Sequence, residues 1–153
     1  MAEIHEGACI CGAIRHKVIG QAFRTVVCHC TFCQRRTGSA FFLSVWFNEE
    51  DVQISGETLR SYEHRSDESN RWLRLQFCST CGCAVTHTAE WLPGARAIAG
   101  GTFDDREWFK IERHIWMRSA QKWVIVPPDV PVFPKAAPAP AQKALTAVLH
   151  GSM

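Results

Sequence analysis

Short runs in which apolar and polar residues alternate recur along most of the chain, and they predict β-strands. Gly, Ser or charged residues bound these runs, so we expect short strands joined by tight turns. One further segment, residues 40–47, is almost entirely apolar and aromatic, which is typical of a buried strand. The alternating runs are residues 13–18, 52–54, 59–62, 73–77, 84–88 and 95–99. The pattern predicts a mainly antiparallel β fold.

Helical signals are confined to two segments, residues 31–37 and 141–149. Residues 127–140 contain too many prolines for either a helix or a strand. The Ala/Pro composition of this region indicates a strap or a loose extension. We therefore expect a tail that begins near Pro127, after a β domain with few short helices.

The size and charge of the chain limit the class of protein. Its 153 residues, 46% hydrophobic and 21% charged, suit one globular domain. The formal net charge of +2 comes without a basic run, so we expect no nucleic-acid partner. The N-terminal sequence lacks a basic start followed by a long apolar stretch, and no run of about 18 apolar residues occurs. We expect no membrane partner and a cytoplasmic location.

The chain has eight cysteines, and they fall into three tight clusters rather than being spread along the sequence. A secreted disulfide scaffold is usually shorter and more evenly spaced. Cysteines one or two residues apart rarely have the Cα separation and Cβ directions that a disulfide needs. The same spacing suits metal ligands. The clusters are Cys9 and Cys11; Cys28, Cys30 and Cys33; and Cys78, Cys81 and Cys83.

The first and last clusters share one pattern, because Cys9-Ile10-Cys11-Gly12 and Cys78-Ser79-Thr80-Cys81-Gly82 each place two thiols in a turn that ends in glycine. Glycine adopts the positive φ that lets the backbone curl around a metal. Each turn supplies half of a tetrahedron, and together they predict a structural four-thiolate zinc site. The alternative is two unrelated pairs of buried cysteines.

The middle cluster differs, because one short turn delivers Cys28, Cys30 and Cys33 to a metal and leaves one tetrahedral position vacant. An open position is what a catalytic zinc needs, and a centre with three thiolates suits a substrate thiol better than water. The alternative is a second structural site completed by His29 or Cys83. Between two ligands in an extended segment, the His29 side chain points the other way, and Cys83 fits a buried free thiol.

Five ordered segments of the chain, with Ser119 and Trp123 after them, carry a resemblance to one known family. They are Gly7-Ala8-Cys9-Ile10-Cys11-Gly12, the stretch from Cys28-His29-Cys30-Thr31-Phe32-Cys33 to Gly38, Phe77-Cys78-Ser79-Thr80-Cys81-Gly82, Gly100-Gly101-Thr102-Phe103-Asp104-Asp105 and His114-Ile115-Trp116. Together they resemble the glutathione-dependent formaldehyde-activating enzyme family. The resemblance runs from Gly7 to about Pro134.

This resemblance implies a fold and a set of metal ligands. The fold is a single zinc-stabilised domain of the β-tent type over residues 1–134, followed by an Ala/Pro-rich tail over residues 135–153. Two zinc ions per chain are implied, and the partition agrees with the one that spacing favours. The ligands are Cys9, Cys11, Cys78 and Cys81 for the structural zinc, and Cys28, Cys30 and Cys33 for the second, catalytic zinc.

The resemblance also implies a function, carbon-sulfur lyase or synthase activity on adducts of a small thiol such as glutathione and a small aldehyde such as formaldehyde. Arg35 and Arg36 directly follow the three-cysteine turn, where they contact a substrate carboxylate or merely offset thiolate charge. His114 is either a packed core histidine or a general base. The alternative function is a non-catalytic zinc module that acts as a thiol, metal or redox sensor or binds a protein.

Overall fold

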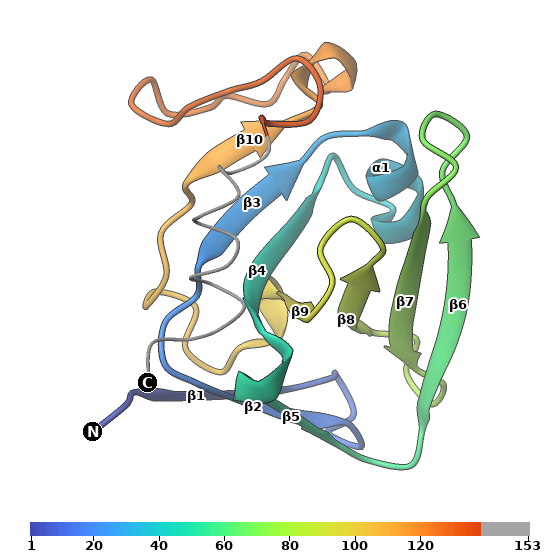
Figure 1. Cartoon of the computed structure of the whole chain (residues 1–153), viewed down its shortest axis with the longest axis vertical. Coiled ribbons are helices and arrows are strands. Elements are labelled where there is room, and N and C mark those ends of the chain that lie inside the picture. The colour runs from blue at the N-terminus through green and yellow to red at the C-terminus, as the bar shows by residue number, and fades with distance from the viewer. Residues whose placement is uncertain (139–153) are drawn as a thin grey trace.

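Strands dominate the computed structural model, which describes residues 1–138 of the chain (Figure 1). The strands are β1 (Ile4–Ala8), β2 (Arg15–Ile19), β3 (Arg24–Cys28), β4 (Phe42–Asn48), β5 (Val52–Ser55), β6 (Leu59–Arg65), β7 (Trp72–Cys78), β8 (Ala84–Ala89), β9 (Ala95–Ala99) and β10 (Arg113–Ile115). The helices are α1 (Thr31–Thr37) and three short 3-10 turns, η1 (Glu49–Asp51), η2 (Gly100–Thr102) and η3 (Met117–Ser119). The predicted helix at 141–149 lies outside the described residues.

The strands form two sheets. The small sheet has the order β1-β2-β5, and the large sheet has the order β10-β3-β4-β9-β8-β7-β6. All strand pairs are antiparallel except β10 with β3, which is parallel. The predicted fold class is thereby confirmed: residues 1–138 form a mainly β domain of the β-tent type with two sheets and one α-helix.

Each of the seven predicted strand segments contains or overlaps a strand, whereas β1, β3 and β10 lie outside those segments. The segment that forms β3 contains Thr25, Val26 and Val27 in succession, and all three are buried. A central strand covered on both faces shows no alternation, so the period-two signal is missing. β1 contains Gly7, whose missing side chain admits the carbonyl of Thr102 and the ring of His16.

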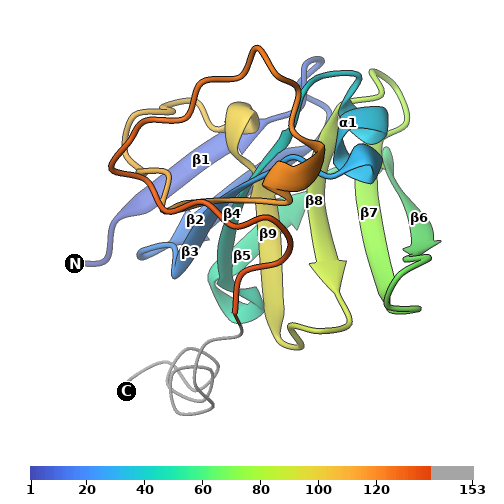
Figure 2. The same ribbon diagram turned by 90° about the horizontal axis from the view of Figure 1, so that it is seen from above.

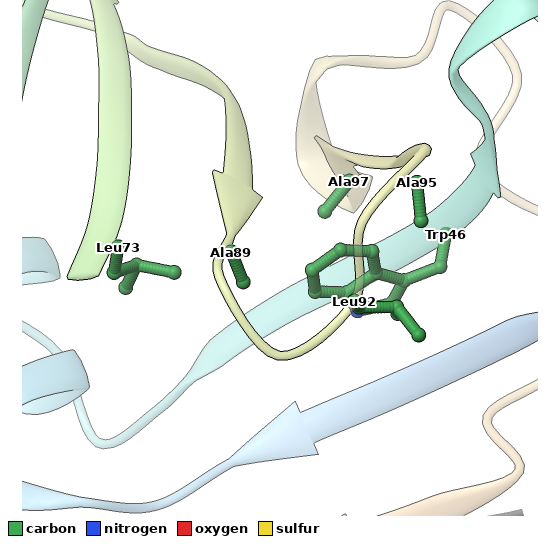
Figure 3. Packing of buried hydrophobic residues seen from close by; sticks show 6 residues of the cluster. All are labelled: Trp46, Leu73, Ala89, Leu92, Ala95 and Ala97. Atoms are coloured by element: carbon green, nitrogen blue, oxygen red, sulfur yellow. The ribbon is translucent and has the colours of Figure 1, made fainter. Parts of the chain in front are cut away.

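The two faces of the large sheet carry separate cores. On one face, Val45, Phe47 and Ile98 pack with Val18 of β2 and with Phe103, and this cluster joins the two sheets. On the other face, Trp46 lies against Leu92 with three alanines nearby (Figure 3). Phe32 of α1 packs against this second core, so the helix covers that face of the large sheet.

The segment after β10 first passes α1 and then returns to pair with β10. Val132 bridges His114, and the backbone N–H of Phe133 donates to the carbonyl of His114 at 3.0 Å. Seen from above, the turn η3 lies beside α1 (Figure 2). The domain boundary after residue 134 stays a prediction. Within residues 1–138, none of the helices has the length and apolarity needed to cross a membrane.

Candidate metal centres

Cys9, Cys11, Cys78 and Cys81, the four-cysteine group, come together with all four sulfur atoms within 4.8 Å of one another. The Cys11 sulfur lies 3.7 Å from that of Cys9 and 3.8 Å from that of Cys78. Four sulfurs bound to one zinc at about 2.3 Å in a tetrahedron are separated by about 3.8 Å. The sulfur positions therefore fit a four-coordinate zinc.

Two matching turns produce this geometry. The N–H of Gly12 donates to the carbonyl of Cys9 at 3.1 Å, and the N–H of Gly82 donates to that of Cys78 at 2.8 Å. Both glycines have positive φ, 77° and 75°, which would strain any residue with a side chain. Each turn thus directs its two thiols toward the same point, as the shared sequence pattern predicted.

Hydrogen bonds to the sulfurs favour the ionised thiols that a metal needs. The N–H of Ile14 donates to the Cys9 sulfur at 3.3 Å, and the Thr58 hydroxyl lies 3.2 Å from the Cys78 sulfur. The bond from Thr58 is the main reason why the pKa of Cys78 falls to about 6. Donors aimed at a sulfur stabilise its negative charge, which is expected around a metal-bound thiolate.

The three-cysteine group, Cys28, Cys30 and Cys33, lies where β3 passes into α1, and its three sulfurs also fall within 4.8 Å of one another. Cys28 is the last residue of β3, and Cys30 is the N-cap of α1. The Cys30 sulfur accepts from the N–H of Cys33 at 3.3 Å, so the residue that caps the helix also presents a ligand. One strand-to-helix turn therefore delivers all three thiols.

Without a cation, only one of the three thiols ionises readily, because a thiolate at one cysteine raises the pKa of the others. Hydrogen bonds from Cys28 and Cys33 lower the pKa of Cys30 to about 3. The same contacts with Cys30 raise the pKa of Cys28 to about 12, and contacts with Cys28 and Cys30 raise that of Cys33 further. A metal ion that binds all three as thiolates removes this conflict.

Within residues 1–138, no fourth Cys, His, Asp or Glu joins the three-cysteine group. Cys83 packs instead beside the four-cysteine group, and its thiol contacts the carbonyl of Ala84 at 3.6 Å. Burial raises the pKa of Cys83, as expected for a thiol that stays protonated. Neither alternative fourth ligand, His29 or Cys83, completes the site in this structure.

His29 and His114 form a buried pair behind the three-cysteine group. The Nε2 atom of His29 lies 2.8 Å from Nδ1 of His114, and the His29 ring contacts Phe41 edge-on. Burial lowers the pKa of both histidines, and each stays neutral at pH 7. Their pairing joins β10 to the β3–α1 turn, so they support the position of the cysteines.

Arg35 and Arg36 lie on different sides of α1. The Arg36 guanidinium stacks on the Phe42 ring, with its Cζ atom 3.8 Å from the ring centroid. Burial lowers the pKa of Arg36, whereas the charges of Cys33, Cys28 and Cys30 raise it. Phe42, on which Arg36 stacks, is buried in the same cluster as Cys33. Arg35 is exposed and lines a cleft with Thr31 and Gln34 on another side of the helix.

Comparison with known proteins agrees with these two cysteine groups. Residues 4–119 match the family model described as glutathione-dependent formaldehyde-activating enzyme. The chain belongs to this family. A solved structure of a Rhodobacter sphaeroides protein is similar in fold to this family member, with a TM-score of 0.53 and 21% identity, over 69% of this chain and 96% of that chain. A search of curated proteins found no match.

Several residues around the cysteines had escaped sequence analysis, notably Phe42, Thr58 and Gln34. Phe42 belongs to the predicted strand at 40–47, but only the register that pairs it with Cys28 brings it under Arg36. Thr58 lies in a loop, with no motif to connect it to Cys78. Gln34 was noted only as part of the family-like stretch, and its role as a link to the carbonyls of His29 and Ser119 depends on tertiary structure.

Proposed function

We propose that this family member is a zinc-dependent carbon-sulfur lyase or synthase that acts on adducts of a small thiol and a small aldehyde. Glutathione and formaldehyde are the pair that the family name suggests. The observation that carries the proposal is the three-cysteine group, which has no fourth ligand within residues 1–138 and lies in one cluster with Phe42, on which the partly buried Arg36 cation stacks. A site with three protein ligands leaves one position for a substrate.

The four-cysteine group fits a structural zinc, because its sulfur separations match tetrahedral coordination and its glycine turns supply no further ligand. The three-cysteine group, Cys28, Cys30 and Cys33, fits the second zinc. Bound there, the ion supplies Lewis-acid stabilisation of a substrate sulfur, so that the thiol ionises near neutral pH.

Arg36 balances the negative charge of this site. Three thiolates around a divalent cation carry about one net negative charge, and a substrate thiolate adds another. The stacking of Arg36 on Phe42 fixes its guanidinium, so no side-chain ordering is needed when the substrate arrives. Among the described residues Arg36 has no carboxylate partner within salt-bridge distance, which leaves its charge for the thiolates.

The apolar residues around the three cysteines limit the access of water. Phe42 and Ala99 are buried in the same cluster as Cys33, and Phe32 and Ala84 pack against it. A low dielectric strengthens the attraction between Arg36 and the thiolates. It also protects a hemithioacetal from competing reactions with water.

The chemical step is an addition, and it needs no oxidant. The thiol proton leaves, a sulfur lone pair forms a bond to the aldehyde carbon, and the carbonyl electron pair moves to the oxygen, which takes up a proton. The product is an S-hydroxymethyl thioether, and the reverse sequence is the lyase reaction. The site contributes proximity and charge stabilisation to both directions.

The proposal includes a cytoplasmic location. All eight cysteines are free, and both groups need reduced thiols to bind metal. A reducing compartment keeps thiols in that state and holds glutathione in its thiol form.

The test is exchange between glutathione and its hydroxymethyl adduct, followed by NMR with ¹³C-formaldehyde. The zinc-loaded protein is expected to accelerate exchange above the protein-free rate, and Cys30→Ser is expected to abolish the acceleration. Cys83→Ser, which changes a thiol outside both groups, is the matched control and should retain activity. Wild-type protein with two zinc ions and no acceleration would leave a non-catalytic zinc module as the function.

A further inference from the structure

His87 is a buried histidine in β8, on the face of the large sheet that α1 covers. It is only 5% exposed. It pairs with Ala97 of β9, which pairs in turn with Trp46 of β4. Directly opposite residues in a sheet point to the same face, and Trp46 and Ala97 belong to the core on the α1 side (Figure 3). The His87 side chain therefore shares this face with α1.

Aromatic rings enclose the His87 imidazole and leave its nitrogens unpaired. Its ring meets those of Trp46 and Phe42 edge-on, with centroids 5.0 Å and 5.4 Å away. Its Nδ1 atom is fully buried without a hydrogen-bond partner, whereas Nε2, also unbonded within residues 1–138, is not fully enclosed. An unpaired buried polar atom costs about 1–3 kcal/mol. Phenylalanine would avoid this cost in such a cage, so stability alone does not explain a histidine here.

Phe42 connects His87 to the three-cysteine group. Phe42 lies directly opposite Cys28 in the pairing of β3 with β4, and it is buried in one cluster with Cys33. His87 contacts the same ring. Since each contact spans about 4–5 Å, His87 lies within about 10 Å of the three-cysteine group. A substrate sulfur and the small aldehyde that it attacks fit within that distance.

The local shape of β8 and β9 supports this placement. Ala84 packs against the cluster of Cys33, although residues 84 and 87 of a regular strand point to opposite faces. The pairing of β7 with β8 shifts register just after Ala84, so both residues reach the α1 face. β9 lies between β4 and β8 and contributes Ala97 and Ala99 to this region, where methyl groups take little room.

The proposed addition places negative charge on the aldehyde oxygen, and the groups described so far act elsewhere. Arg36 balances the charge at sulfur, and His29 and His114 are bonded to each other. Burial, with the charges of Arg36 and Arg96, holds the pKa of His87 well below its ordinary value, so its imidazole is neutral. A neutral imidazole keeps one N–H donor, and a donor in a site of low dielectric stabilises a developing oxyanion.

We propose that His87 is a catalytic residue that donates a hydrogen bond from Nε2 to the aldehyde oxygen and stabilises the negative charge formed there. The proposal rests on the function proposed above and adds a residue outside both cysteine groups. The imidazole keeps its proton throughout. The proton that the thiol releases passes to water, and water supplies the proton that the oxygen takes up, so the addition stays balanced. In the lyase direction the same bond stabilises the oxygen as the carbon-sulfur bond breaks.

The test measures exchange of ¹³C-formaldehyde with glutathione, the glutathione dissociation constant and the unfolding temperature, all on the zinc-loaded full chain. His87→Phe suits the aromatic cage but removes the donor, so the acceleration of exchange is expected to fall about 100-fold. The dissociation constant should stay within about twofold. The unfolding temperature should equal or exceed that of wild type, because the unpaired nitrogen is gone. His87→Gln keeps an N–H donor and should lose less than about tenfold.

His16→Gln is the matched control, because His16 is a buried histidine outside both cysteine groups, bonded to Thr102. It should retain the wild-type exchange rate. Full exchange activity in His87→Phe would overturn the assignment. A joint fall in exchange, glutathione affinity and unfolding temperature would assign His87 to packing instead. If phenylalanine prevents folding, the smaller His87→Leu makes the same comparison. Wild-type protein that accelerates no exchange would end the proposed function, and the role of His87 with it.

Discussion

The two cysteine groups use the same ligand type but close very different lengths of chain. The four-cysteine group takes Cys9 and Cys11 from the turn after β1, in the small sheet. It takes Cys78 from the end of β7, in the large sheet, and Cys81 from the turn that follows. The three-cysteine group takes all its sulfurs from the end of β3 and the start of α1.

Because of this difference, a metal bound at each group is expected to contribute differently to the stability of the fold. Closing a long loop removes more conformational freedom from the unfolded chain than closing a short one, so a metal at the four-cysteine group contributes more to folding. A metal at the three-cysteine group constrains little chain and keeps one position free of protein ligands within residues 1–138. Under the proposed function, one ligand chemistry thus serves stability at the four-cysteine group and reactivity at the three-cysteine group.

The largest effect is expected for Cys81→Ser. A structural zinc contributes on the order of 10 kcal/mol, which is comparable with the whole stability of a domain. The variant should lose its zinc at the four-cysteine group and unfold, as measured by circular dichroism and zinc content per chain. Cys83→Ser, two residues further on and outside both groups, should keep two zinc ions and fold. A Cys81→Ser protein that unfolds cooperatively at the wild-type temperature would contradict the structural role.

Cys30→Ser is expected to remove the second zinc and leave a folded protein. Serine is a favoured N-cap residue, so α1 keeps its first hydrogen bond while the site loses a thiolate. The midpoint of chemical unfolding should correspond to a loss within about 1 kcal/mol, with one zinc per chain remaining. Complete unfolding of this variant would mean that both groups are structural.

The local features of both groups were predictable from sequence, because they depend on residues close together in the chain. The pairing of thiols, the glycines with positive φ and the helix at Thr31–Thr37 all follow from short patterns. The surroundings were not predictable. The contact of Arg36 with Phe42 depends on strand register. The side-chain hydrogen bonds from Gln121 to Gln34 and from Trp123 to Gln121 depend on the path of the segment after β10, which brings it beside α1.

The same limit explains why most of the strands were predicted and their order in the sheets was not. Alternation identifies a half-buried strand such as β2, but it carries no information about its neighbours. The parallel pairing of β10 with β3 brings His114 to His29, and no local pattern indicates it. The same pairing is why His114 supports the β3–α1 turn, a role that its sequence position alone did not reveal.

Besides the four-cysteine group, a second contact joins the two sheets, and the pH dependence of stability tests it. His16 of β2 is bonded at 2.9 Å to Thr102 of η2, and burial lowers the pKa of His16 from 6.5 to about 4. A neutral buried histidine stabilises the fold above pH 6.5, and this contribution is lost as pH falls toward 4. Between pH 7 and 5 it amounts to about 2 kcal/mol.

His16→Gln is therefore expected to flatten the decline of unfolding free energy between pH 7 and 5 by about 2 kcal/mol. Zinc content is measured at each pH, since protons also compete for the thiolates. His87, which burial also keeps neutral on the other face of the large sheet, remains in both proteins and cancels in the comparison. Identical pH profiles for variant and wild type would show that His16 does not carry this dependence.

The smallest effect concerns the charge at the three-cysteine group. The Arg36 guanidinium stacks on Phe42, which is buried in the same cluster as Cys33, so Arg36→Gln should weaken the binding of glutathione and of 2-mercaptoethanol alike, by about 1 kcal/mol or roughly fivefold. Arg71→Gln, at an exposed arginine outside both cysteine groups, is the control and should leave both affinities unchanged. Zinc content should stay at two per chain, since neither guanidinium is a ligand.

Because Arg36 is partly buried on Phe42, Arg36→Lys separates the effect of charge from that of packing. The lysine keeps the cation and should restore much of the affinity for both thiols. Equal weakening by Lys and Gln would instead assign the effect to the lost stacking on Phe42.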